Sequence, residues 1–70
     1  MIEFDLNGRQ LILDEQIVRQ MRERALAGAG SSSTLNDLAV ILTRALSEPK
    51  PVTLRRAESR ALERLLEPSG

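Results

Sequence analysis

The chain contains no cysteine and no histidine among its 70 residues. Without cysteine it has neither disulfides nor thiolate clusters to support a small fold, and without imidazole or thiolate ligands a zinc or haem site is not expected. Tyrosine and tryptophan are also absent, so catalysis would have to rely on serine, threonine, carboxylates and one lysine. We therefore expect neither an enzyme nor a cofactor-binding protein.

The chain also has no net charge, because ten Lys and Arg residues balance ten Asp and Glu residues. No field of the whole molecule would attract nucleic acid or anionic lipid. The first residues do not combine a basic stretch with a long apolar run, since Glu3 and Asp5 interrupt it, and this argues against a signal peptide or a membrane span. We expect a cytoplasmic protein. Arginine supplies nine of the ten basic residues, which favours a bacterial or phage origin.

The dipeptide Asn7-Gly8 predicts a β-hairpin over residues 1–13, closed by a type I′ turn. The expected pairs are Leu6 with Arg9, Phe4 with Leu11 and Ile2 with Leu13. Apart from Arg9, these residues make one apolar face, while Glu3, Asp5, Gln10 and Ile12 share the other. Because two strands alone are marginally stable in water, the hairpin must lie on its own helices or pair with a second copy.

Apolar residues at helical spacing predict three helices, over about residues 15–27, 35–47 and 54–67. Asp14, Thr34 and Thr53 are the expected N-caps, and Asp37 would complete a capping box with Thr34. Pro49 and Pro51 predict an extended connector before the third helix, and Pro68 ends it. The sequence thus predicts an α+β fold, a single domain over residues 1–70 with the order ββααα.

Several side chains lack an assigned place in the predicted core, and they are our candidates for an interface. Glu58 falls inside the apolar arc of the third helix, and pairing with Arg55 is favoured over a pair across an interface. That arc is broad enough to touch two neighbours. The candidate set is Ile12, Leu26, Val40, Glu58, Leu62 and Leu66.

The leading functional hypothesis is a small non-enzymatic protein–protein interaction module that forms a homodimer. Two hairpins would share a sheet, or the third helix would pack on its mate. A bacterial or phage regulatory accessory protein is the kind of role expected. Whether a further protein partner exists stays open.

The alternative hypothesis is a small DNA-binding regulator. Its contacts would come from Arg55, Arg56, Arg60 and Arg64 on the third helix, with Arg19 and Arg22 in addition. Against it, Glu63 and Glu67 lie on the same side of that helix and suit intrahelical ion pairs. The connector is also longer than a helix-turn-helix turn. Single-stranded nucleic acid is less favoured, because Phe4 is the only aromatic residue and the core needs it.

Overall fold

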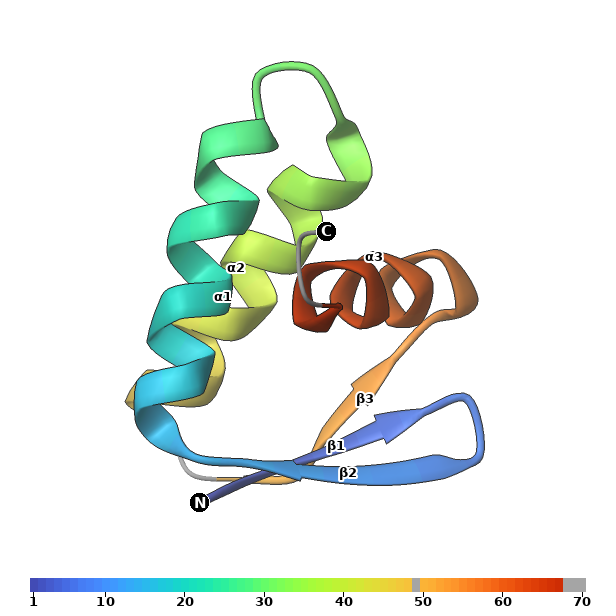
Figure 1. Cartoon of the computed structure of the whole chain (residues 1–70). Helices are drawn as coiled ribbons and strands as arrows, with labels where there is room; N and C mark the ends of the chain where they lie inside the picture. The colour runs from blue at the N-terminus through green and yellow to red at the C-terminus, as the bar shows by residue number, and fades with distance from the viewer. Residues whose placement is uncertain (49, 68–70) are drawn as a thin grey trace.

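Six secondary-structure elements follow one another in the computed structural model, which describes residues 1–48 and 50–67. They are β1 (Ile2–Leu6), β2 (Arg9–Leu13), α1 (Glu15–Gly28), α2 (Ser33–Ser47), β3 (Val52–Leu54) and α3 (Arg56–Leu66). The expected α+β class is confirmed, with a hairpin followed by three helices, and a short strand is added before the last helix. Figure 1 shows α1 and α2 standing on the sheet and α3 lying crosswise to them.

The hairpin forms in the predicted register, with Leu6 opposite Arg9 and Phe4 opposite Leu11. Asn7 and Gly8 both have positive φ angles, 56° and 101°, as a type I′ turn requires. The Gly8 N–H also donates to Asp5 Oδ1 at 3.0 Å. The turn therefore matches the right-handed twist of the strands, which explains why a dipeptide could predict the register.

The third strand, β3, was not predicted. It pairs in parallel with β1, so the strand order is β2-β1-β3 and β1 is central. The expectations that Thr53 caps the third helix and that this helix begins at Leu54 are wrong. Val52 to Leu54 are instead extended, because the β-branched residues after Pro51 suit a strand and pairing buries the Leu54 side chain. Pro49 and Pro68 lie outside the described residues.

Other parts of the same chain support the hairpin on its edge and on its apolar face. The edge of β1 that is not used by β2 is occupied by β3, and the apolar face of the hairpin is buried. The hairpin is therefore paired with a third strand and covered by helices of its own chain. Of the two alternatives predicted for the hairpin, the structure shows the first, since the hairpin lies on its own helices, and β3 adds a third strand that was not predicted.

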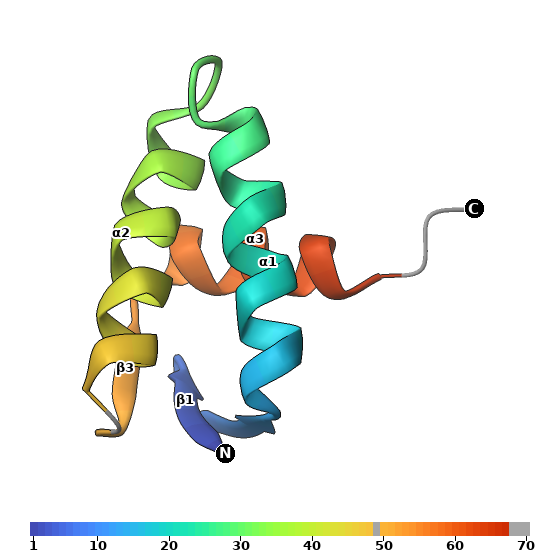
Figure 2. The same ribbon diagram turned by 90° about the vertical axis from the view of Figure 1, so that its left-hand side faces the viewer.

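The first two helices form an antiparallel pair whose connecting loop lies on the side away from the sheet (Figure 2). Asp14 occupies the N-cap position of α1, as predicted, but its side chain makes no capping hydrogen bond. The predicted capping box of Thr34 is wrong, since Ser32 is the N-cap of α2 and its Oγ accepts from the Leu35 N–H at 3.3 Å. A Cβ on Gly28 would meet the end of the Leu35 side chain, which would have to turn aside.

Helix α3 begins at Arg56, two residues later than predicted, and Arg55 is its N-cap. Glu58 Oε1 accepts from the Arg55 backbone N–H at 3.0 Å. Glu58 therefore does interact locally with Arg55, but through the backbone amide of that residue. Glu58 as a whole is half-buried, and its carboxylate satisfies one of the free N–H groups at the start of the helix, which explains an acidic residue inside an apolar arc.

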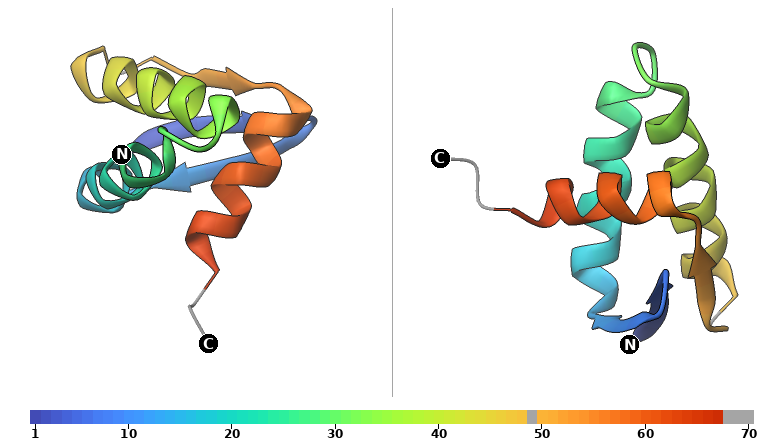
Figure 3. Two further views of the ribbon diagram at one scale, coloured as in Figure 1. Left: turned by 90° about the horizontal axis from the view of Figure 1, so that it is seen from above. Right: turned by 90° about the vertical axis from the view of Figure 1, so that its right-hand side faces the viewer.

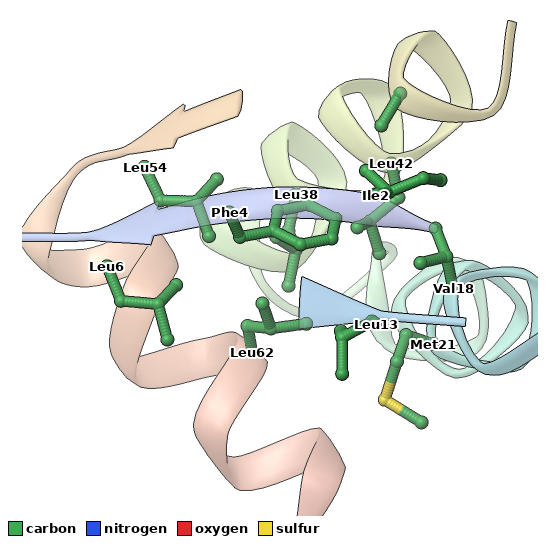
Figure 4. Packing of buried hydrophobic residues seen from close by; sticks show 11 residues of the cluster. Ile2, Phe4, Leu6, Leu13, Val18, Met21, Leu38, Leu42, Leu54 and Leu62 are labelled. Carbon is green, nitrogen blue, oxygen red and sulfur yellow. The ribbon is translucent and has the colours of Figure 1, made fainter. Parts of the chain in front are cut away.

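One hydrophobic core joins the inner face of the sheet to all three helices, as Figure 4 shows for its central residues. Its largest fully buried side chains come from β1, α1, α2 and α3; they are Phe4, Val18, Leu38, Leu42 and Leu62. Along β1 the buried residues alternate with exposed Glu3 and Asp5, as a half-buried strand requires. The outer face of the sheet carries exposed side chains, and no helix among residues 1–48 and 50–67 covers it.

Candidate interaction surfaces

The outer edge of β2 is the longer of the two free edges of the sheet, with five residues against three in β3. In a two-residue hairpin, the residues that flank the turn exchange hydrogen bonds, and bonding then alternates along the strand. Arg9, Leu11 and Leu13 therefore bond to β1. The N–H and C=O groups of Gln10 and Ile12 point outward, where they can pair with a further strand.

The C-terminal part of α3 extends past this edge of the sheet. The views from above and from the side agree that α3 crosses the strands and reaches beyond β2 (Figures 2 and 3). Leu65 and Leu66, in its last turn, are half-buried and pack against the core, and so is Leu11 on β2. The space beside β2 is therefore bordered by the free backbone groups of that strand and by the last turn of α3.

Two polar contacts connect this overhanging part of α3 to β2 and α1. Glu63 Oε1 lies 3.4 Å from Arg9 Nη1 of β2, and both side chains are exposed. The Arg24 guanidinium of α1 donates to the Leu65 carbonyl at 2.8 Å. The second contact satisfies one of the carbonyls that a helix leaves free at its C-terminus, and a positive charge is favourable there. Arg24 was not singled out from the sequence, because its partner is 41 residues away.

The six predicted interface residues differ in their exposure. Glu58 accepts the hydrogen bond at the start of α3 described above. Ile12, Leu26 and Val40 are each about half exposed, at 51%, 51% and 49% of the side chain and backbone surface. Leu66 is half-buried at the end of α3. Leu62 is 0% exposed in the core of its own chain, because the crosswise position of α3 turns it onto the sheet, and it is therefore not available to a partner.

The exposed apolar residues do not form one patch. Ile12 lies on the outer face of the sheet, opposite Glu3 in the register. Leu26 lies near the end of α1 that meets the helix-connecting loop, on the far side of the molecule from the sheet (Figure 1). Isolated apolar residues are ordinary on protein surfaces. Only Ile12 adjoins the free edge of β2.

A second surface is an open groove of about 1080 Å³ between α3 and the beginning of α2. Its α3 side carries Arg56, Arg60 and Arg64, three of the four arginines proposed for nucleic acid; Arg55 does not line it. The predicted intrahelical ion pairs of this helix are wrong. Glu63 pairs with Arg9, and within residues 1–48 and 50–67 none of the three groove arginines lies within ion-pair distance of a carboxylate.

The remaining arginines of the alternative hypothesis lie elsewhere. Arg19 pairs with Glu15 on α1 at 3.2 Å, one helical turn away. Arg22 is half-buried, and its Nε is buried without a hydrogen-bond partner in the described part of the chain. Because β3 separates α2 from α3, these two helices do not form a helix-turn-helix unit.

None of the helices within residues 1–48 and 50–67 has the length and apolar character needed to cross a membrane. The same residues contain no cluster of three or more acidic side chains placed to hold a metal ion. Comparisons with protein-family models, with curated proteins and with solved structures found no match to this chain.

Proposed function

We propose that this chain is a small, non-enzymatic interaction module that associates with a second copy of itself through the free edge of β2. The observation that carries the proposal is the position of α3, which continues beyond β2 and borders the place of a further strand. A strand added there would gain backbone hydrogen bonds from β2 and apolar cover from Leu66. A strand at the edge of β3 would gain neither to the same extent, since β3 has three residues.

A second copy suits this edge because two antiparallel β2 strands are self-complementary. With a two-fold axis at Leu11, Gln10 of one copy faces Ile12 of the other, and both residues have outward N–H and C=O groups. Leu11 of the two copies would then form the closer, non-hydrogen-bonded pair. The sheet would continue across both copies, and each overhanging α3 would lie over the strand of its mate.

The decisive test removes one outward hydrogen-bond donor without changing the hairpin. Gln10→Pro loses an N–H that β1 does not use, and proline is tolerated on an edge strand at such a position. We expect the wild-type chain to sediment as a dimer and Gln10→Pro to sediment as a monomer. Gln10→Thr, which keeps the N–H and favours a strand, should remain dimeric. Circular dichroism and urea unfolding check that both variants fold.

A matched pair of surface substitutions separates the β2 edge from the rest of the molecule. Ile12→Lys and Val40→Lys replace side chains that are 51% and 49% exposed, and only Ile12 adjoins the edge. We expect Ile12→Lys to weaken dimerisation about tenfold, or about 1.4 kcal/mol, and Val40→Lys to leave it unchanged. A wild-type chain that stays monomeric at millimolar concentration, or equal effects of the two substitutions, contradicts the proposal.

A further inference from the structure

Helix α3 presents two parallel rows of side chains along the groove that it forms with α2. Each row has the spacing i, i+4, i+8, so its members lie about 6 Å apart along the helix. The rows are Arg56, Arg60 and Arg64, and beside them Ala57, Ala61 and Leu65. The groove therefore offers positive charge along one line and apolar surface along the next.

None of the arginines in this row forms an ion pair with a carboxylate of the described residues. All three side chains are exposed. Of the two acidic residues that line the groove, Glu63 is engaged by Arg9, and Glu67 follows the last turn of α3. A ligand that brings carboxylates or phosphates to this row would meet unpaired guanidinium groups.

The other side of the groove is uncharged. Ser32 and Thr34 contribute short polar side chains, and Leu35 contributes an apolar side chain that is half-buried. Together with half-buried Ala61 and Leu65, Leu35 gives the groove an apolar lining between its two sides. A fitting ligand must carry anionic groups on one side and apolar groups on the other.

This combination distinguishes between two kinds of anionic partner. A nucleic acid backbone would use the arginines but not the apolar lining, and Phe4, the only aromatic side chain, is fully buried and cannot stack on a base. The chain also has no net positive charge. A protein segment with carboxylates and leucines at helical spacing would use both rows, since its i, i+4 spacing equals that of α3.

We propose that the groove between α3 and the start of α2 binds an acidic amphipathic helix of a protein partner. The carboxylates of that helix face Arg56, Arg60 and Arg64, and its apolar side chains rest on Leu35 and Leu65. The inference goes beyond the proposed self-association, because its ligand lies between α3 and the start of α2, whereas the proposed contact between two copies is made by the free edge of β2.

The test uses a fluorescent helical peptide with glutamate and leucine in adjacent rows at i, i+4 spacing, and a second peptide with lysine in place of glutamate. Fluorescence anisotropy should show saturable binding of the glutamate peptide only, weakening as salt rises. The triple variant Arg56→Gln, Arg60→Gln, Arg64→Gln should bind it at least tenfold more weakly. The control is the triple variant Arg19→Gln, Arg44→Gln, Lys50→Gln, whose residues do not line this groove. It has the same net charge as the groove variant, and it should bind the peptide like the wild type.

Three results would overturn this inference. They are no saturable binding of the glutamate peptide, equal binding by the two triple variants, and tighter binding of a short DNA duplex through the same arginines. The last result would assign the groove to nucleic acid. Gln10→Pro keeps the groove intact and should bind the peptide as the wild type does, so a failure of self-association and a failure of the groove can be told apart.

Discussion

The central strand β1 has two neighbours that are specified in different ways. On one side β2 pairs with it along five residues, after a turn of two residues. On the other side β3 pairs with it along three residues, and each partner in β3 lies 48 positions after its partner in β1, as Val52 does after Phe4. Both neighbours place leucines on the same inner face, since Leu13 and Leu54 are buried at 7% and 3% exposure.

The difference shows what local sequence can and cannot specify. The β1–β2 pair follows from residues 7 and 8, because only a few residue types adopt two consecutive positive φ angles. The β1–β3 pair has no such local signal. It closes a loop that contains α1 and α2, so the entropy of loop closure must be offset by contacts that are distant in the sequence.

The largest effect is expected for the strand that both neighbours share. Phe4 is 0% exposed at the centre of β1, and Phe4→Ala should lower the free energy of unfolding by about 3–5 kcal/mol. A 70-residue domain has only about 4–10 kcal/mol in all, so the variant should be largely unfolded by urea concentrations that the wild type withstands. Phe4→Leu, the conservative control, should lose less than half as much. An equal loss for both would contradict this account of the core.

Leu54→Ala acts on the β3 side alone. The side chain is 3% exposed, and its truncation should lower the free energy of unfolding by about 2–5 kcal/mol, measured by urea unfolding. Hydrogen exchange should show that β3 amides lose more protection than those of the hairpin turn. Val52→Ala, which truncates a half-buried residue of the same strand, is the control and should cost less. Equal loss of protection throughout the sheet would show that the two pairings are not separable.

Gly8→Ala acts on the β2 side alone. Gly8 has a φ angle of 101° and no atom within 4 Å of an added Cβ, so the cost is conformational and not steric. We expect a loss of about 1–2 kcal/mol in thermal or urea unfolding. Gly30, which also has open space but no positive φ, is the matched control. If Gly30→Ala costs as much as Gly8→Ala, the positive φ is not the reason for glycine in the turn.

The smallest effect is expected for the ion pair between β2 and α3. Arg9 and Glu63 lie 3.4 Å apart, with side chains 77% and 44% exposed. A double-mutant cycle with alanine at each position should give a coupling energy of about 0–1 kcal/mol, decreasing with salt. A larger, salt-insensitive coupling would mean that this contact helps to fix α3 beyond the sheet edge.

The candidate surfaces could be predicted only in part. The sequence identified Ile12, Leu26 and Val40 as apolar residues outside any amphipathic face, and they are exposed. It placed Leu62 among surface candidates, since a broad apolar arc does not reveal which part is buried. The sequence identified the arginine row but predicted that Glu63 pairs with an arginine of its own helix. From the sequence alone, Arg60, one helical turn away, is as good a partner for Glu63 as Arg9 of β2. Their roles in binding stay predictions.

Local chemistry alone determined the hairpin, its register and the existence of three helices, since positive φ angles, alternation of apolar residues and helical periodicity act over a few residues. Only the tertiary structure decided the third strand, the crosswise position of α3 and the groove beside it. These depend on which buried surfaces meet, and residues far apart in the chain supply both partners. The proposed binding surfaces depend on these contacts between distant parts of the chain.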